Sequence, residues 1–319
     1  MGGISVFLSL IVAMTGIFEL FYFVPEPDQA ALSIQVIAYH VPYGWLVRNI
    51  HYWAAQLLVI TVILHLIRVV FTGAYRPPRD FNYQLGLLLL VVVLLFDFTG
   101  YVLRWDQGIH WALVTGTNLL RTIPLIGSSL YLIVVGGDQP GPSTLVRFYA
   151  WHIFGLTIIF SFFTIWHLFR VRRDGGIATP PPHQRRNNSR ITRYELARRE
   201  FLTVIVGSAI LLAFANLLPA PISPPLSDSN ITTEIARAPW FFLWIQQLLK
   251  YGNPFLLGIC VPTVVLLIFS TLPYLFPLPL PEELGSWFPK HNRLAQLCVF
   301  GLLIIICTLA ILAIQPSPP

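Results

Sequence analysis

Charged residues are scarce in this chain. Asp, Glu, Lys and Arg make up 11% of the 319 residues, whereas soluble domains carry about 25%. Hydrophobic residues make up 55%, and the mean hydropathy is +0.70. This composition excludes an ordinary soluble protein and predicts an integral membrane protein with no nucleic-acid partner.

Cysteine is also scarce, and its spacing is uninformative. Cys260, Cys298 and Cys307 lie in apolar stretches, and neither CxxC nor CxxCH occurs. A covalent c-type haem and a cysteine-based zinc site are therefore not indicated, and we interpret the three as structural thiols. The first apolar stretch lacks a basic segment before it, so we interpret it as a spanning helix and not as a cleavable signal.

Seven apolar runs are long enough to cross a hydrocarbon core about 30 Å thick. Because backbone groups must be paired inside lipid, we expect them to be helices. We predict an all-α membrane fold with a four-helix half at 1–178, a basic linker at 179–199 and a three-helix half at 200–319. Short interfacial helices are expected at 105–142. The predicted spans are 2–24, 46–71, 84–103, 145–171, 201–218, 255–276 and 294–313.

Arginines predict the orientation. Arg76 and Arg79 follow the second span, and a larger set follows the fourth: Arg170, Arg172, Arg173, Arg185, Arg186, Arg190, Arg193, Arg198 and Arg199. Positive loops stay on the cytoplasmic side. We therefore expect a cytoplasmic N-terminus and a C-terminus on the outer side, with the second and fourth spans parallel.

Those two parallel spans carry matched histidine pairs. His51 and His65 are 14 residues apart, and His152 and His167 are 15 apart. Both members of a pair fall on one helix face, about 21 Å apart along the axis. A lone histidine in a span more often packs or lines a cavity. Two matched pairs instead predict two stacked bis-imidazole sites for non-covalent b-type haems, namely His51 with His152 near the outer face and His65 with His167 near the inner face.

Glycines and arginines accompany the histidines. Gly2 and Gly16 in the first span, and Gly86 and Gly100 in the third, repeat the interval of 14. We interpret them as clearance for the haems, with small-residue helix packing as the alternative. Three arginines near the two levels are candidate partners of haem propionates, with snorkelling anchors as the alternative: Arg48, Arg68 and Arg147.

Four stretches resemble cytochrome b of quinol–cytochrome c oxidoreductases, the bc-type complexes. They are Gly-Trp-Leu-Val-Arg-Asn-Ile-His at 44–51, His-Leu-Ile-Arg at 65–68, Gly-Tyr-Val-Leu-Arg-Trp-Asp-Gln at 100–107 and Arg-Phe-Tyr-Ala-Trp-His at 147–152. The interval of 15 is similar to the plastoquinol-oxidising branch, and the last three spans resemble the small subunit of that branch, here joined in one polypeptide. That branch holds an extra haem through a cysteine before the first Gly-Gly; Met1 stands there, so we expect no such bond.

The resemblance implies a function and partners. Quinol would be oxidised near the outer face, and electrons would cross two b haems to a quinone at the inner face, coupled to proton translocation. The implied partners are a Rieske-type iron–sulfur protein, a c-type cytochrome and a second copy of the complex, in a bacterial cytoplasmic or photosynthetic membrane. Arg172 and Asp174 would lie at the inner quinone site, with a solvated loop ion pair as the alternative for Asp174. The chain alone would complete no turnover.

One departure concerns the outer quinol site. The family motif there is Pro-Glu-Trp-Tyr, but residues 238–241 read Ala-Pro-Trp-Phe, and Gln246 and Gln247 stand where some bacterial members have a glutamate. Pro239 and Trp240 remain as site residues. Asp97, between two phenylalanines, is our candidate proton acceptor, the alternative being an ion pair with Arg104, which replaces the family's proline. The missing glutamate also keeps open a one-sided dihaem electron conduit with another redox partner. A non-redox bundle would bind no haem.

Overall fold

The computed structural model describes residues 1–175, 193–226, 237–280, 283 and 286–315. Within these residues the chain is helical and contains no strand. Seven described helices are long and apolar enough to cross a membrane, which confirms the predicted spans. They are Gly2–Leu20, Gly44–Phe71, Asp80–Leu103, Pro142–Arg173, Ala197–Leu217, Phe255–Leu275 and Lys290–Ile314.

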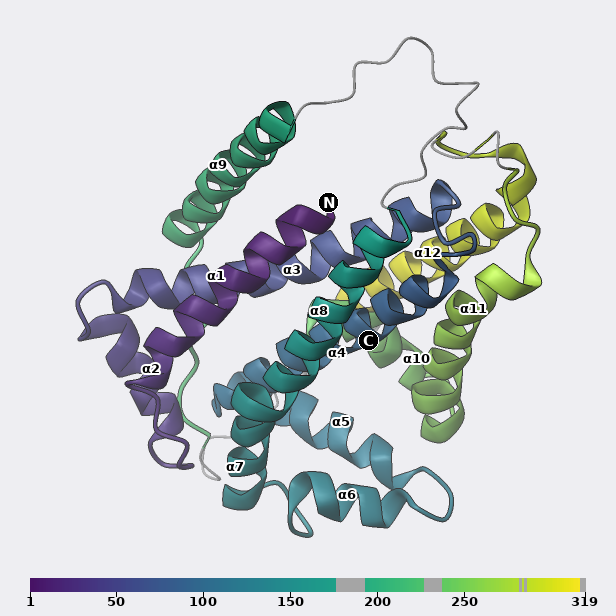
Figure 1. The fold of residues 1–319 in the computed structure, drawn as a ribbon. Coiled ribbons are helices and arrows are strands. Elements are labelled where there is room, and N and C mark those ends of the chain that lie inside the picture. Colours follow the sequence, from purple (N-terminus) through teal and green to yellow (C-terminus); the bar gives the residue numbers. More distant parts are fainter. Residues whose placement is uncertain (176–192, 227–236, 281–282, 284–285, 316–319) are drawn as a thin grey trace.

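The N-terminal half is a bundle of four long helices (Figure 1), namely α1 (Gly2–Leu20), α3 (Gly44–Phe71), α4 (Asp80–Leu103) and α8 (Leu156–Arg173). Helix α1 packs against α3, α4 packs against α8, and α3 contacts α4. Helix α8 continues α7 (Pro142–Ala150) through a single π-helical turn, Trp151–Gly155. The buried side chains between α1, α3 and α4 are apolar and include Leu8, Ala54, Val59 and Val93.

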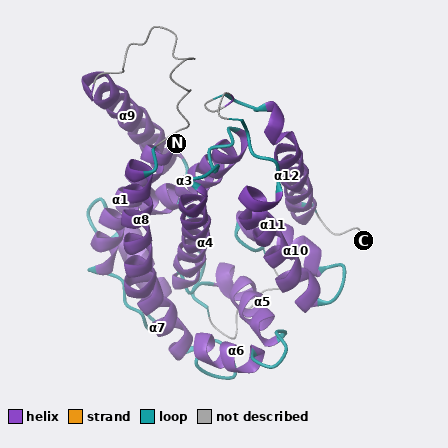
Figure 2. Cartoon of the chain, turned by 45° about the vertical axis from the view of Figure 1, so that its right-hand side comes forward, coloured by secondary structure: helices purple, strands orange, loops and turns teal. Residues whose placement is uncertain are grey.

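Short helices cover one end of this bundle (Figure 2). The prediction of short helices at 105–142 is confirmed by η1 (Gln107–Ile109), α5 (His110–Arg121) and α6 (Gly127–Val135). Another short helix, α2 (Ala30–Tyr39), precedes α3. They are anchored by a cluster of fully buried side chains, among them Val102, Ile109, Leu113 and Leu145.

The C-terminal half flanks the bundle. Helix α9 (Arg193–Leu217) packs against α1 and α3, while α11 (Val261–Leu275) contacts α4 and α12 (Arg293–Ile314) contacts α3. Because α9 begins at Arg193, the end of the predicted linker 179–199 is helical; the rest of it, with Arg185, Arg186 and Arg190, lies outside the described residues. The remaining elements are η5 (Trp240–Phe242), α10 (Leu243–Leu249), the π-helical η6 (Phe255–Cys260), α11 (Val261–Leu275), η8 (Lys290–Asn292) and α12 (Arg293–Ile314).

Buried hydrogen bonds join the two halves at one end of the bundle. The Tyr75 hydroxyl donates to Asn292 Oδ1 over 2.5 Å, and Asn292 Nδ2 donates to the Val70 carbonyl over 2.9 Å. Tyr83 donates to the Phe269 carbonyl over 2.8 Å. Tyr75 and Asn292 are both fully buried, so each needs the other as a hydrogen-bond partner.

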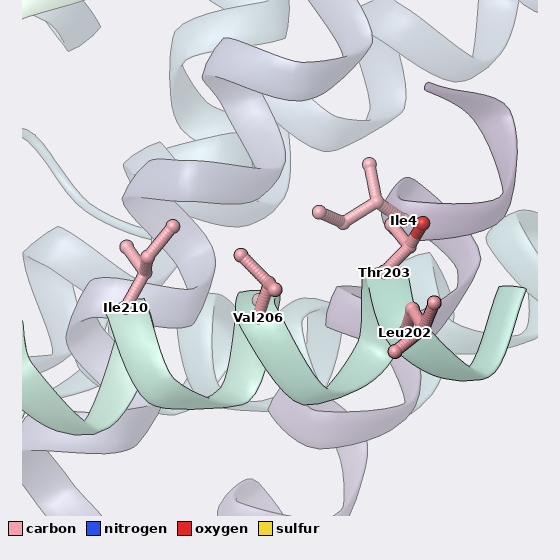
Figure 3. A pocket seen from close by; sticks show the side chains of 6 residues that line it. Ile4, Leu202, Thr203, Val206 and Ile210 are labelled. Atoms are coloured by element: carbon pink, nitrogen blue, oxygen red, sulfur yellow. The ribbon is translucent and has the colours of Figure 1, made fainter. Parts of the chain in front are cut away.

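A shallow hollow of about 300 Å³ lies between α1 and α9. Figure 3 shows Ile4 of α1 facing the α9 side chains. Apart from the Thr203 hydroxyl, the lining side chains are apolar: Ile4, Leu202, Val206 and Ile210, together with Gly207. A hollow with no ionisable group suits lipid or packing and offers nothing to redox chemistry or proton transfer.

Candidate functional site

The four paired histidines lie inside the bundle at two levels. His51 and His65 belong to α3, His152 to the π-helical turn and His167 to α8. The rings of His51 and His152 are close enough to interact electrostatically, and so are the rings of His65 and His167. The structure therefore brings together the same pairs that the spacing predicts.

The π-helical turn accounts for the unequal spacing of the two pairs. A π-helical turn closes hydrogen bonds from residue i to i+5, so it holds one residue more than an α-helical turn. Trp151–Gly155 lies at the His152 end of the 15-residue interval. It absorbs the extra residue, so that His152 and His167 stay in register with the 14-residue pair on α3. Sequence periodicity could not show this turn.

Each predicted glycine lies against one histidine ring. A Cβ atom at Gly16 would be 3.1 Å from His51 Cε1, and one at Gly100 would be 2.9 Å from His152 Cε1. At the other level, a Cβ at Gly2 would be 3.5 Å from His65 Cε1, and one at Gly86 would be 3.3 Å from His167 Cε1. In contrast, a Cβ at Gly3 would meet nothing within 4 Å. The glycines therefore leave space for the imidazole rings themselves.

Two threonines fix the rings of the first pair. Thr15 Oγ1 donates to the Ile11 carbonyl over 2.7 Å and lies 3.0 Å from His51 Nδ1. We assign Nδ1–H as the donor to Thr15, because the hydroxyl has one hydrogen and this assignment satisfies both contacts. Thr99 does the same, donating to the Leu95 carbonyl over 2.9 Å and lying 2.9 Å from His152 Nδ1. Both rings are thereby held as the tautomer whose free nitrogen is Nε2, the arrangement typical of metal-ligating histidines.

The second pair lacks such partners. His65 Nδ1 and His167 Nδ1 are buried and bond to no threonine or other side chain within the described residues. His167 interacts instead with the backbone at Asn82. None of the four rings uses Nε2 in a hydrogen bond to another described residue. Two levels of paired imidazoles, each with a free Nε2 and a glycine beside it, fit bis-imidazole haem ligation.

The three arginines predicted to pair with haem propionates differ in their burial and in their hydrogen-bond partners. Arg48 is buried and donates to the carbonyls of Ala220 and Pro221 over 3.1 and 2.6 Å, so it holds the loop that follows α9. Arg147 donates to the Ser143 carbonyl over 3.3 Å, and Arg68 is half-buried.

One further arginine was missed as a site residue. Arg79, used above only for orientation, has Nε and Nη1 buried with no hydrogen-bond partner within the described residues. Such donors suit a carboxylate of a bound group.

The loop after α9 lies over the His51/His152 end of the bundle. Pro225 forms an isolated bridge with Asp106, and the Ser223 amide donates to Asp106 Oδ2 over 3.3 Å. Arg104 forms an ion pair with Asp106 at 2.6 Å. The alternative in which Arg104 pairs with Asp97 is therefore not what the structure shows.

Asp97 instead belongs to a hydrogen-bonded chain that reaches Trp240. Gln56 Nε2 donates to Asp97 Oδ1 over 2.8 Å, and Trp240 Nε1 donates to Gln56 Oε1 over 2.7 Å. Pro239 immediately precedes η5. Gln246 accepts from the Ala238 amide over 2.7 Å, which fixes the start of this segment.

At the His65/His167 end, Asp174 lies among arginines. It pairs with Arg170 at 2.8 Å and with Arg173 at 2.7 Å. Arg170 also stacks over Phe81, with 4.8 Å from its guanidinium carbon to the ring centre. Arg172 is exposed. Asp174 is therefore ion-paired, as in the alternative given above, but its side chain is only 4% exposed and the pair is not solvated.

Comparisons with known proteins identify the family to which the chain belongs. The family model described as "Cytochrome b/b6/petB" matches residues 1–175. The cytochrome b6 of Heliomicrobium gestii is 36% identical over 175 residues, which are 55% of this chain and 82% of that protein. The cytochrome b6 of Acaryochloris marina is 38% identical over 175 residues, 55% of this chain and 81% of that protein.

The fold extends beyond the region matched by sequence. A solved structure titled "Hyperthermophilic respiratory Complex III" superposes with a TM-score of 0.85, at 22% identity, over 100% of this chain and 84% of that one. It shares the fold of both halves. The matched residues 1–175 include the four paired histidines, their glycines and their threonines, and the chain belongs to the cytochrome b/b6 family, whose members bind b-type haem in the membrane.

Proposed function

We propose that this chain is the cytochrome b subunit of a bc-type complex. It would move electrons from quinol, through two transmembrane b haems, to a quinone at the inner face, with protons released outside and taken up inside. The observation that carries the proposal is the repetition of one arrangement at two levels: two facing histidines, each with a glycine beside its ring.

The residues of the chain would prepare each level for its haem. His51 and His152 would bind one haem and His65 and His167 the other, each through Nε2. A haem held between two imidazoles supplies a one-electron carrier with no open position for oxygen. Thr15 and Thr99 orient the rings of the first pair, while the second pair has no such bond to another described residue. This difference supports two carriers with different potentials.

Quinone chemistry would occur at both ends. The loop held by Arg48, together with Pro239 and Trp240, would cover the outer quinol site. Arg172 and Asp174 would lie at the inner site, where arginine can bind a reduced quinone oxygen and a carboxylate can relay protons. An iron–sulfur protein of the Rieske type and a c-type cytochrome are the expected partners, in a dimeric complex, with the N-terminus cytoplasmic and the C-terminus outside.

One observation favours a second candidate. Residues 238–241 contain no carboxylate, so the chain could serve a one-sided quinone reductase or oxidase with a different redox partner. Pro239 and Trp240 are still present in the segment at the His51/His152 end, and this favours the first candidate. An enzyme that handles quinone only at the opposite face would need no quinol loop at this end.

Purification of the intact complex tests the proposal. We expect a b-type reduced-minus-oxidised spectrum with two components, a co-purifying iron–sulfur subunit, and haem reduction by quinol that an outer-site inhibitor blocks. Two haems without an iron–sulfur subunit and without inhibitor sensitivity would support the one-sided enzyme, and a colourless complex would contradict both candidates.

A further inference from the structure

We propose that Asp97 is the proton acceptor of the outer quinol site and that Gln56 positions it against Trp240. This inference rests on the proposed function and specifies how the outer site works without the glutamate of the family motif. It concerns one aspartate and two hydrogen bonds, all within the described residues.

The direction of both hydrogen bonds is fixed by chemistry. An indole nitrogen can only donate, so Trp240 Nε1 must donate to the Gln56 carbonyl oxygen, over 2.7 Å. The Gln56 amide then points at Asp97, donating to Oδ1 over 2.8 Å. Because a flipped amide would set two donors against each other, the glutamine has one orientation. Asp97 Oδ2 keeps no hydrogen bond to another described residue.

Asp97 forms no ion pair with another described residue. The described ion pairs do not include it, and Arg104 is engaged by Asp106 at 2.6 Å. Ionisable groups inside spanning helices are costly and mark proton or ligand pathways. An apolar residue at this position would leave the Gln56 amide without its acceptor but would break no other described hydrogen bond or ion pair.

The neighbours of Asp97 place it between the haem ligand and the quinol loop. The Phe96 ring meets the His152 ring edge-on, with 5.5 Å between centres. The Phe98 ring meets Phe242, which follows Trp240 in η5, with 5.9 Å between centres. A quinol bound under this loop would therefore lie close to both Asp97 and His152.

The proposed step moves one proton and no electron. The quinol O–H bond breaks, its electron pair stays on the quinol oxygen, and the proton moves to the Asp97 carboxylate. The products are a quinol anion, which is easier to oxidise than neutral quinol, and a neutral carboxyl group still held by Gln56. Release of that proton restores the carboxylate.

The test uses the complete complex in membranes and four variants. Asp97→Asn should slow reduction of the His51/His152 haem by quinol by about 100-fold, within the usual contribution of general base catalysis. Asp97→Glu should retain most of the rate. Gln56→Met, which removes both hydrogen bonds, should slow the rate and shift its pH profile. Glu19→Gln is the matched control and should keep the wild-type rate, because Glu19 is another carboxyl at the same end of the bundle, within electrostatic reach of Arg48.

A second readout separates this inference from the proposed function. Quinol oxidation in wild type should produce an infrared difference band of a carboxyl group gaining a proton, and Asp97→Asn should lack it. If wild type reduces its haems with quinol but Asp97→Asn has the same rate and band, the inference is wrong while the function stands. If wild type shows no quinol-driven reduction, the proposed function itself fails. If Asp97→Asn does not retain haem, Gln56→Met decides the question. A slower haem reduction with a shifted pH profile in Gln56→Met supports the inference, and an unchanged rate and pH profile overturn it.

Discussion

Replacing Gly100 by alanine tests the close approach of α4 to the His152 ring. The new Cβ would lie 2.9 Å from His152 Cε1, whereas carbon atoms prefer a separation of about 3.5–4.0 Å. The ring would have to move by roughly 0.6–1.1 Å. The bond to Thr99 and the edge of Phe96 restrict that movement.

The change in the free energy of unfolding caused by Gly100→Ala can be bounded from two known effects. Overpacking of this kind costs about 1–3 kcal/mol, and alanine stabilises a helix relative to glycine by about 1 kcal/mol. The net change in overall stability is therefore small, but the displacement falls on the ring of His152. We expect Gly100→Ala to lose or shift the haem of the His51/His152 level and to leave the other haem unchanged.

The assay is a potentiometric titration of the b-type spectrum, and the chain provides its own controls. Gly3→Ala adds the same methyl group where nothing lies within 4 Å and should leave both haems unchanged. Gly86→Ala, with 3.3 Å to His167 Cε1, should affect the other level and more mildly. Wild-type potentials in Gly100→Ala, or loss of haem in Gly3→Ala, would refute the reasoning.

Three further predictions concern hydrogen bonds. Thr15→Val and Thr99→Val should each raise the potential of one haem only, by tens of millivolts, because a ring that loses its Nδ1 acceptor donates less to the iron; equal shifts of both haems in a redox titration would contradict this. Arg48→Met should remove two bonds to loop carbonyls, each worth about 1.5–3 kcal/mol, and should speed proteolysis or hydrogen exchange of residues 219–226; unchanged protection would count against an anchoring role. Burial raises the pKa of Tyr75 from 10.0 to about 12 despite its bond to Asn292, so the folded state holds this proton more tightly, and stability should fall as pH rises from about 10 to about 12. Tyr75→Phe should abolish that part of the pH dependence in thermal unfolding, and its persistence would assign it to another group.

The helices and the pairing of the histidines could be predicted because they depend on local patterns. Long apolar runs must become helices in lipid, and equal intervals between His51 and His65, or Gly86 and Gly100, place residues at equal heights on neighbouring helices. The pairing of each glycine with one particular ring follows from helix packing, which the sequence does not specify.

Other features depend on contacts that no local pattern encodes. The π-helical turn at Trp151–Gly155 differs from an α-helical turn only in its hydrogen bonds. Thr15 looks like any threonine that bonds back to its own helix, and its bond to His51 appears only when α1 meets α3. Gln56 and Trp240 are 184 residues apart, so nothing in the sequence links them.

The most direct test of the central claim is a redox titration of variants in which one histidine of each pair is replaced. Wild type should show two b-type transitions. His152→Ala should retain only the transition of the His65/His167 level, and His167→Ala only that of the His51/His152 level. Two unchanged transitions in either variant, or a colourless wild-type complex, would contradict the account.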